Sequence, residues 1–210
     1  MDRLFIPGFG APAGLYRPAL ADGWTALELP RFREMQGVLR AYRAWLESEL
    51  DRLDGDVWLA GHSMGGALGV LAAATRPERI ARLTLISPAG LPLQKSMTAS
   101  LADFARQVAS SRYAGADALV AVGRVLAAPR AALRLAREVH ALDLTLEMER
   151  VRRSGCPVEV VACASDTLVT PSHCRRQAHL LGANYRRLAL HGGHMWMLTA
   201  PEQLAAVLGV

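Results

Sequence analysis

Apolar residues recur along this chain with two different periods, and the two kinds of segment alternate. Short runs of apolar and β-branched residues predict buried strands at residues 4–6, 24–29, 57–60, 80–87, 157–163 and 185–190. Apolar residues at helical spacing predict helices at residues 32–53, 65–75, 172–181 and 201–208. Because strands and helices alternate, the sequence predicts an α/β fold with a mainly parallel, doubly wound sheet.

The alternation breaks after Ser87, where prolines and glycines end the fourth predicted strand. The following stretch, to about residue 153, contains no strand candidate. Its periodicity predicts helices at residues 100–108, 117–126, 129–142 and 143–152. An all-helical segment that leaves the carboxyl end of a strand lies above the sheet edge where α/β folds bind ligands. We therefore predict one domain over residues 1–210 that carries a helical lid at residues 91–153.

Length, the first residues and the cysteines indicate the class of protein. A chain of 210 residues is long enough for one buried core and short for two. No apolar stretch approaches the roughly 18 residues of a membrane span, so a soluble protein is expected. The opening MDRLFIPGFG contains no stretch of signal-peptide length, which favours the cytoplasm. Cys156, Cys163 and Cys174 lack metal-ligand spacing, so a reducing compartment and no metal are expected.

The net charge of +5 comes mainly from arginines scattered along the predicted helices. Nucleic-acid binding is not expected, because that function needs a contiguous basic face. One local pattern stands out at Arg130, Arg134 and Arg137, which share a face at helical spacing. Three further arginines follow along the chain at Arg150, Arg152 and Arg153. This basic face is either a solvated helix surface or a docking site for an acidic partner.

The segment VWLAGHSMGGALGVLAA, residues 57–73, holds the first candidate for chemistry. It reads as a buried strand, a tight turn and an apolar helix. Gly61 and Gly65 remove the side chains that would clash around such a turn, so Ser63 would stand clear of the backbone where a base can reach it. Ser63 is therefore the predicted nucleophile. A turn that serves only close packing is the alternative.

A serine hydroxyl is a weak nucleophile and needs a base, which in turn needs an orienting group. Asp166 follows the fifth predicted strand in CASDTLVTP, and His194 follows the sixth in HGGHMWML. Each of the three residues thus comes directly after a strand, in the chain order serine, acid, histidine. We predict that His194 transfers the proton of Ser63 and that Asp166 fixes the imidazole tautomer. His191 is the rival histidine, and Asp166 could instead be a turn-former.

A tetrahedral intermediate carries an oxyanion that needs preorganised donors. The predicted donors are the backbone N–H groups of Met64, directly after the nucleophile, and of Phe9 in the loop PGFGAP. A tight turn is the alternative for that loop. Apolar side chains near the predicted lid and triad suggest a substrate pocket without strong polar selection. The predicted pocket residues are Met97, Leu101, Phe104 and Trp196.

Taken together, PGFG, GHSMGG, the helical insertion, ASDTLVTP and GGHMWML resemble the α/β-hydrolase superfamily over nearly the whole chain. The resemblance implies an acyl-transfer mechanism with an acyl-Ser63 intermediate, a lid that shapes the pocket, and no metal or organic cofactor. One departure is Pro7, which stands where family members commonly have a histidine before the glycine of the oxyanion loop. That change leaves the N–H donor intact but alters how the loop is held.

The leading hypothesis is a serine hydrolase that cleaves a small-molecule carboxylic ester or thioester. A second hypothesis keeps the triad but docks an acidic acyl carrier protein on the basic face of the lid. A third is a ligand-binding or lyase-type member of the same fold, because fold analogy alone does not exclude it.

Overall fold

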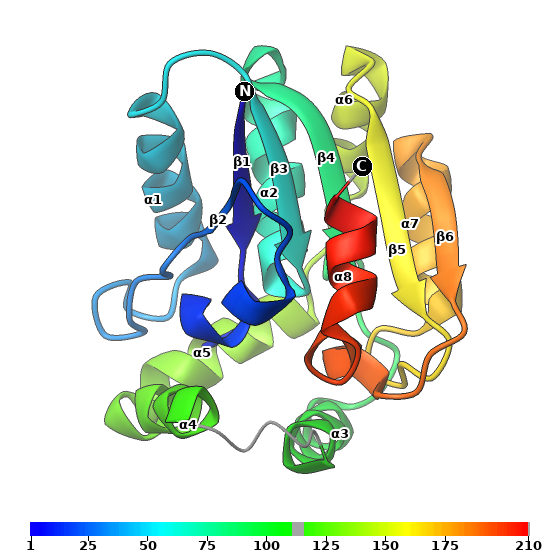
Figure 1. The fold of residues 1–210 in the computed structure, drawn as a ribbon. Coiled ribbons are helices and arrows are strands. Elements are labelled where there is room, and N and C mark those ends of the chain that lie inside the picture. The colour runs from blue at the N-terminus through cyan, green and yellow to red at the C-terminus, as the bar shows by residue number, and fades with distance from the viewer. Residues whose placement is uncertain (111–115, 210) are drawn as a thin grey trace.

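The computed structural model describes residues 1–110 and 116–209, and within them a single six-stranded sheet. Its strands are β1 (Asp2–Ile6), β2 (Trp24–Ala26), β3 (Val57–His62), β4 (Ile80–Ile86), β5 (Val158–Cys163) and β6 (Asn184–Leu188). The strand order is β2-β1-β3-β4-β5-β6, and every neighbouring pair is parallel. The α/β prediction with a mainly parallel sheet is confirmed. All strands therefore present their carboxyl ends at one edge (Figure 1).

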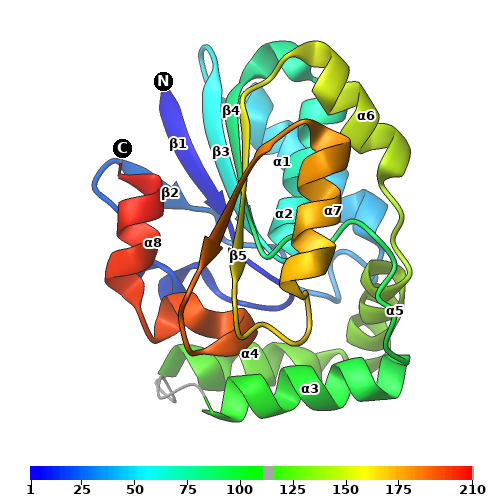
Figure 2. The ribbon, with the colours of Figure 1, turned by 90° about the vertical axis from the view of Figure 1, so that its right-hand side faces the viewer.

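Helices cover both faces of the sheet (Figure 2). One face carries α1 (Leu39–Asp51), α2 (Met64–Thr75), α6 (Thr145–Ser154) and α7 (Pro171–Leu181). The other carries α8 (Pro201–Leu208) with the 3₁₀ helices η1 (Ala13–Leu15), η2 (Arg17–Ala19) and η4 (Gly193–Leu198); η3 (Pro77–Arg79) precedes β4. A separate hydrophobic core fills the space on each face. Within the described residues, no helix has both the length and the apolar character to cross a membrane.

Three helices lie across the carboxyl edge of the sheet and are here called the cap helices (Figures 1 and 2). They are α3 (Met97–Ser110), α4 (Ala116–Ala127) and α5 (Pro129–His140). The first packs against η4, the second against η1 and α5, and the third against α1. These contacts join the cap helices to both faces of the body, above the point where the predicted catalytic residues lie.

The predicted lid boundary at residue 153 includes one helix that belongs elsewhere. Helix α6 packs between α2 and α7 beside the sheet, and its Met148 and Val151 are fully buried in the core of that face. The cap helices therefore end at His140. Periodicity identified α6 as a helix, but its apolar stripe is the same whether it meets a sheet or covers a site.

The helix predicted over residues 32–53 begins only at Leu39. Gln36 and Gly37 both have positive φ, 51° and 66°, which no helix tolerates. The N–H of Leu39 donates to a carboxylate oxygen of Glu138 on α5, at 2.8 Å, so the cap of this helix comes from a residue far along the chain. Local sequence carries no sign of that partner.

Two strands are shorter than predicted. Strand β2 pairs only three residues with β1 at the sheet edge, rather than running to residue 29. Strand β6 ends at Leu188, because the next residues turn toward the loop after β5, where the carbonyl of Leu190 accepts a hydrogen bond from the Ser165 hydroxyl at 2.9 Å.

Helix α2 lies unusually close to the sheet, and glycines make this possible. A Cβ atom on Gly65 would overlap the carbonyl oxygen of Ile6 on β1, and one on Gly61 would overlap the backbone of Gly65. Ile6 of β1 and Gly61 of β3 are also paired directly across the two strands. The turn between β3 and α2 is thus clamped against the end of β1, where the PGFG loop begins.

Gly65→Ala is therefore expected to lower the free energy of unfolding by about 2 kcal/mol or more, because backbone must move to admit the methyl group. Urea denaturation followed by circular dichroism measures the change. Gly123→Ala is the matched control: that glycine lies on α4 with open space around its Cβ position, so the substitution should cost nothing. Equal stability of the Gly65→Ala variant and the native chain would contradict the clamp.

Candidate active site

Ser63 sits at the sharp turn between β3 and α2. Its φ of 53° and ψ of −117° are strained for a residue with a side chain, and such strain costs on the order of 1–3 kcal/mol. Backbone hydrogen bonds hold the turn: the Ser63 N–H donates to the carbonyl of Ile86 at 3.0 Å, and the Ser63 carbonyl accepts from the N–H of Ala89 at 2.9 Å. The half-buried serine lines the cavities described below.

His194 and Asp166 form a buried hydrogen-bonded pair. The Nδ1 atom of His194 lies 2.8 Å from Oδ2 of Asp166, and both side chains are almost fully buried. The other oxygen of Asp166 accepts from the N–H groups of Leu168 and Val169, at 2.9 and 3.0 Å. This arrangement favours the tautomer with hydrogen on Nδ1 and leaves Nε2 free to accept a proton.

Nε2 of His194 is buried, and no described residue gives it a hydrogen-bond partner. His194 and Ser63 line the same cavity, so the predicted base and the predicted nucleophile meet at one space. The sequence placed His191 as the rival to His194. The structure gives the contact with Asp166 to His194, while His191 lies exposed before η4.

The two predicted oxyanion donors come from different segments, the loop after β1 and the start of α2. Phe9 lines the same cavity as Ser63, and Met64 begins α2 directly after it. Among residues 1–110 and 116–209, none accepts a hydrogen bond from the N–H of Phe9 or Met64. The unpaired N–H of Met64 is at a helix start, where backbone donors favour a negative oxygen, and that of Phe9 is in the loop after β1.

Two apolar cavities meet at Ser63. The larger, about 90 Å³, runs under α3 and α5 and includes Met97, Leu101 and Phe104 of the predicted pocket. The smaller, about 40 Å³, lies under α4 beside Tyr16, His62 and His194. Ser63, Phe9 and Phe104 line both. Each cavity thus opens on the nucleophile from a different side.

Trp196 was predicted in the pocket and is found elsewhere. Its side chain is fully buried in the core between the sheet and α8, and it lines neither cavity at Ser63. Its neighbour Met195 does line the smaller cavity. The backbone conformation of η4 determines which of its side chains faces the cavity. The sequence GGHMWML does not reveal that conformation.

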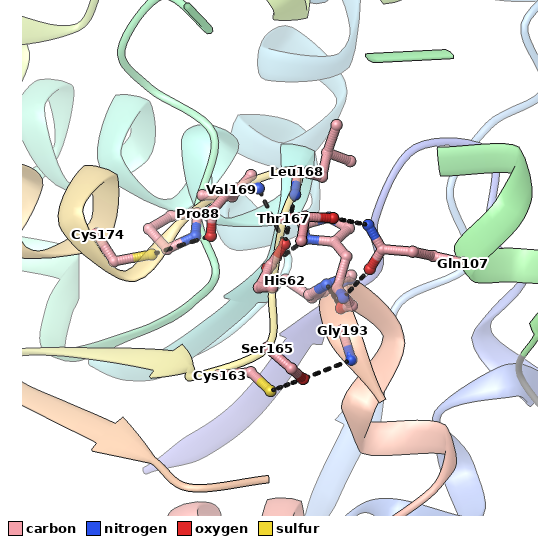
Figure 3. A network of polar contacts seen from close by, with 12 residues as sticks. His62, Pro88, Gln107, Cys163, Ser165, Thr167, Leu168, Val169, Cys174 and Gly193 are labelled. Carbon is pink, nitrogen blue, oxygen red and sulfur yellow. Dashed lines mark hydrogen bonds and ion pairs between the residues drawn. The ribbon is translucent and has the colours of Figure 1, made fainter. Parts of the chain in front are cut away.

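Sequence reasoning missed a polar network that ties α3 to the loops of the acid and the base (Figure 3). The Gln107 side-chain oxygen accepts a hydrogen bond from the backbone N–H of His194, and its amide donates to Thr167 at 3.3 Å. Thr167 in turn donates to Asp103, at 2.9 Å, and Lys95 contacts the same carboxylate at 2.6 Å. Burial opposes the charge on Asp103, but hydrogen bonds from Lys95 and Thr167 outweigh it and lower the pKa of its carboxyl.

The structure also gives His62 a role that the sequence did not suggest. Its Nδ1 lies 2.8 Å from the Tyr16 hydroxyl, and its Nε2 lies 3.0 Å from the carbonyl of His194. Burial, with a smaller contribution from His194, holds the pKa of His62 well below its ordinary value. The imidazole is therefore neutral at neutral pH.

The arginines of the predicted basic face divide between two helices. Arg130, Arg134 and Arg137 are exposed on α5, where Arg134 pairs with Glu138 at 3.7 Å. The later three lie on α6, which packs on the body. Docking of an acidic acyl carrier protein on the α5 arginines stays a prediction.

Comparison with known proteins places this geometry in a family. The model of the alpha/beta hydrolase family matches residues 4–207. The chain belongs to the alpha/beta hydrolase family. Among curated relatives, a protein of Escherichia coli O81 (strain ED1a) whose name describes a carbamate hydrolase, RutD, is 36% identical over 78 residues, or 35% of this chain. Those residues are 28% of that relative, so the chain spans little more than a quarter of its length.

Solved structures share the same hydrolase fold. The deformylase Nfo from Pseudomonas putida S16 has a TM-score of 0.76 at 17% identity, with 100% of this chain and 91% of that chain covered. The enol-lactonase from Burkholderia xenovorans LB400 has a TM-score of 0.73 at 19% identity, with coverages of 99% and 90%. At these identities the likeness concerns the fold alone.

The depressed pKa of His62 predicts a pH dependence of stability. The unfolded chain binds a proton at this residue as the pH falls below about 6.5, whereas the folded chain does not. The free energy of unfolding should therefore fall between about pH 7.5 and 5.5, with this group contributing up to about 1.4 kcal/mol per pH unit. Urea denaturation at several pH values measures the slope.

In His62→Gln the slope should be shallower, because the glutamine does not titrate. His179→Gln changes an exposed histidine on α7 and should leave the slope as in the native chain. Equal slopes for all three proteins would contradict a neutral, buried His62.

Proposed function

We propose that this chain is a serine hydrolase that cleaves a carboxylic ester or thioester through an acyl-Ser63 intermediate. The observation that carries the proposal is the single cavity shared by Ser63, on its strained turn, and by His194, whose Nδ1 is 2.8 Å from buried Asp166. Family membership supports a hydrolytic enzyme. The chemistry below assigns each of these groups a step.

In the first step the Ser63 hydroxyl oxygen attacks the carbonyl carbon, and Nε2 of His194 takes the hydroxyl proton. The oxyanion that forms is held by the N–H groups of Phe9 and Met64. When the intermediate collapses, the imidazolium returns the proton to the leaving alcohol or thiol. Water then attacks the acyl-Ser63 ester while His194 takes its proton, and His194 returns that proton to the Ser63 oxygen as the carboxylic acid leaves. Asp166 stabilises the imidazolium in both halves.

The side chains that line the cavities favour a substrate with a neutral, apolar acyl group. The larger cavity is bounded mainly by leucine, valine, alanine, methionine and phenylalanine side chains. Its polar groups are few, and one of them, His140, is hydrogen-bonded to the Lys95 carbonyl at 2.8 Å. An apolar wall selects by length and shape rather than by charge.

The choice of an ester or thioester rests on leaving-group chemistry. A carbamate or amide hydrolase uses the same triad, and one curated relative has a name of that class, whereas the enol-lactonase acts on a cyclic ester by its name. The described residues that line the two cavities are apolar, hydroxylic or histidine. An alkoxide or thiolate is a better leaving group than an amide anion and needs less proton transfer from His194, which favours an ester or thioester.

A fluorophosphonate probe is expected to label the native chain at Ser63, and p-nitrophenyl esters are expected to be turned over. In Ser63→Ala labelling should vanish and kcat should fall by about 10⁴-fold or more, because the nucleophile is lost. His194→Ala should lose turnover to a similar extent. Label on another residue, or turnover that survives both substitutions, would overturn the proposed role of Ser63. A native chain that shows neither labelling nor turnover would favour a ligand-binding or lyase-type protein.

The preferred length of the substrate's acyl chain is predicted to depend on Ala136, a residue of α5 in the wall of the larger cavity. Ala136→Phe should leave turnover of an acetyl ester within twofold and lower kcat/KM for longer acyl esters about tenfold or more, since each excluded methylene costs about 1 kcal/mol or more. Leu133→Phe, at an exposed position of the same helix, is the control. An unchanged chain-length profile in Ala136→Phe would place the acyl group elsewhere.

A further inference from the structure

The loop that supplies the Phe9 N–H is held by one turn bond of its own, from the Ala11 N–H to the Gly8 carbonyl at 3.1 Å, and by one side chain. It begins at Pro7, which has no N–H to donate and no polar side chain, and continues through Gly8. The N–H of Gly8 donates to the hydroxyl oxygen of Tyr16, at 3.2 Å. This bond fixes the Pro7–Gly8 peptide, one peptide before the one that carries the Phe9 N–H, so the Tyr16 hydroxyl anchors the start of the loop that presents the proposed oxyanion donor.

Tyr16 is fully buried, and its ring is fixed from two sides. It lies 4.8 Å from the Phe5 ring of β1 and 5.8 Å from the His62 ring, between ring centres. The backbone of Gly8 comes so close that a Cβ atom there would stand 2.9 Å from Nδ1 of His62 and 3.3 Å from the Tyr16 hydroxyl. The glycine is therefore required for the loop to reach the tyrosine.

His62 carries the chain of hydrogen bonds across the site. Because its Nε2 faces the carbonyl of His194, which only accepts, Nε2 must hold the hydrogen. Nδ1 is then an acceptor and takes the hydroxyl hydrogen of Tyr16, whose oxygen takes the N–H of Gly8. The three hydrogen bonds all run the same way, from Gly8 to Tyr16, to His62 and to the carbonyl of His194, and each donor has an acceptor. His62 stands directly before Ser63, at the end of β3 (Figure 3).

The far end of this chain holds the base. The backbone carbonyl of His194 accepts from His62, its N–H donates to Gln107, and its Nδ1 contacts Asp166. Three contacts thus fix the backbone and one edge of the imidazole, and Nε2 alone is left for the reaction. The proposed donor loop and the proposed base are therefore connected through two side chains: Tyr16 contacts the loop, and His62 contacts the backbone of the base.

We propose that Tyr16 and His62 form a positioning bridge, which sets the Phe9 N–H and the His194 imidazole at fixed places around Ser63. The inference rests on the proposed function of Ser63 and His194. It assigns neither bridge residue a proton transfer with substrate. The bridge contributes to rate by holding both groups in the geometry that the transition state needs, and contributes little to binding of the ground state.

The test is Tyr16→Phe, which keeps the ring and removes one oxygen. We expect kcat for a p-nitrophenyl ester to fall about tenfold or more while KM changes less than twofold, because the donor loop loses its anchor. The rate of fluorophosphonate labelling at saturation should fall in parallel, since that reaction also builds charge on an oxygen beside Phe9. Kinetics are measured well below the thermal midpoint of each variant, where circular dichroism matches the native chain.

Tyr42→Phe is the matched control, because Tyr42 lies on α1, is buried in the hydrophobic core like Tyr16, and lines neither cavity. Its kcat should stay within twofold of the native value. His62→Gln keeps an N–H for the His194 carbonyl but breaks the bond from Tyr16. The double variant Tyr16→Phe with His62→Gln should be no slower than the slower single variant, because both break one chain.

A Tyr16→Phe variant with native kcat, a loss confined to KM, or multiplicative losses in the double variant would each overturn the bridge. Those results would leave the proposed function standing, provided that the native chain is labelled and Ser63→Ala is inert. A native chain that is neither labelled nor active would instead overturn the proposed function itself.

Discussion

The close approach of α2 to the end of β1 is the constraint on which the site depends. It is possible only because Gly61 and Gly65 leave no side chain between the helix and the sheet. The same approach forces Ser63 into a positive φ at the start of α2 and places it beside the loop that leaves β1. One packing contact therefore sets the strained turn, the start of the helix and the nearest backbone donors together.

Burial explains why the rest of the site is so fully hydrogen-bonded. The His194–Asp166 pair and the imidazole of His62 are buried away from water. In the interior, a polar group without a hydrogen-bond partner costs about 1–3 kcal/mol. Backbone N–H groups, Gln107 and Tyr16 provide the partners. The exception is Nε2 of His194, which has no partner among the described residues. In a buried network with one open atom, that atom is where chemistry is expected.

The sequence predicted what is encoded locally. Strand and helix alternation predicted the sheet, and Ser63, Asp166 and His194 could be proposed as candidates because each follows a strand. Contacts between distant segments left no local signal: Glu138 caps α1, Gln107 reaches His194, and the turn of η4 sends Trp196 into the core. Likewise, an amphipathic stripe showed that α6 is a helix but did not show what it covers. Positive φ at Gln36 shortened α1 in a way that composition does not reveal.

The hydrogen bond from His194 to Gln107 joins the cap helices to the proposed base. Helix α3 contributes Phe104 to the walls of both cavities and Gln107 as the acceptor for the backbone N–H of His194. Any displacement of α3 away from the body would leave this buried N–H without its acceptor, at a cost of about 1–3 kcal/mol. The position of the helix and the order of the proposed base are therefore coupled: one contact sets both.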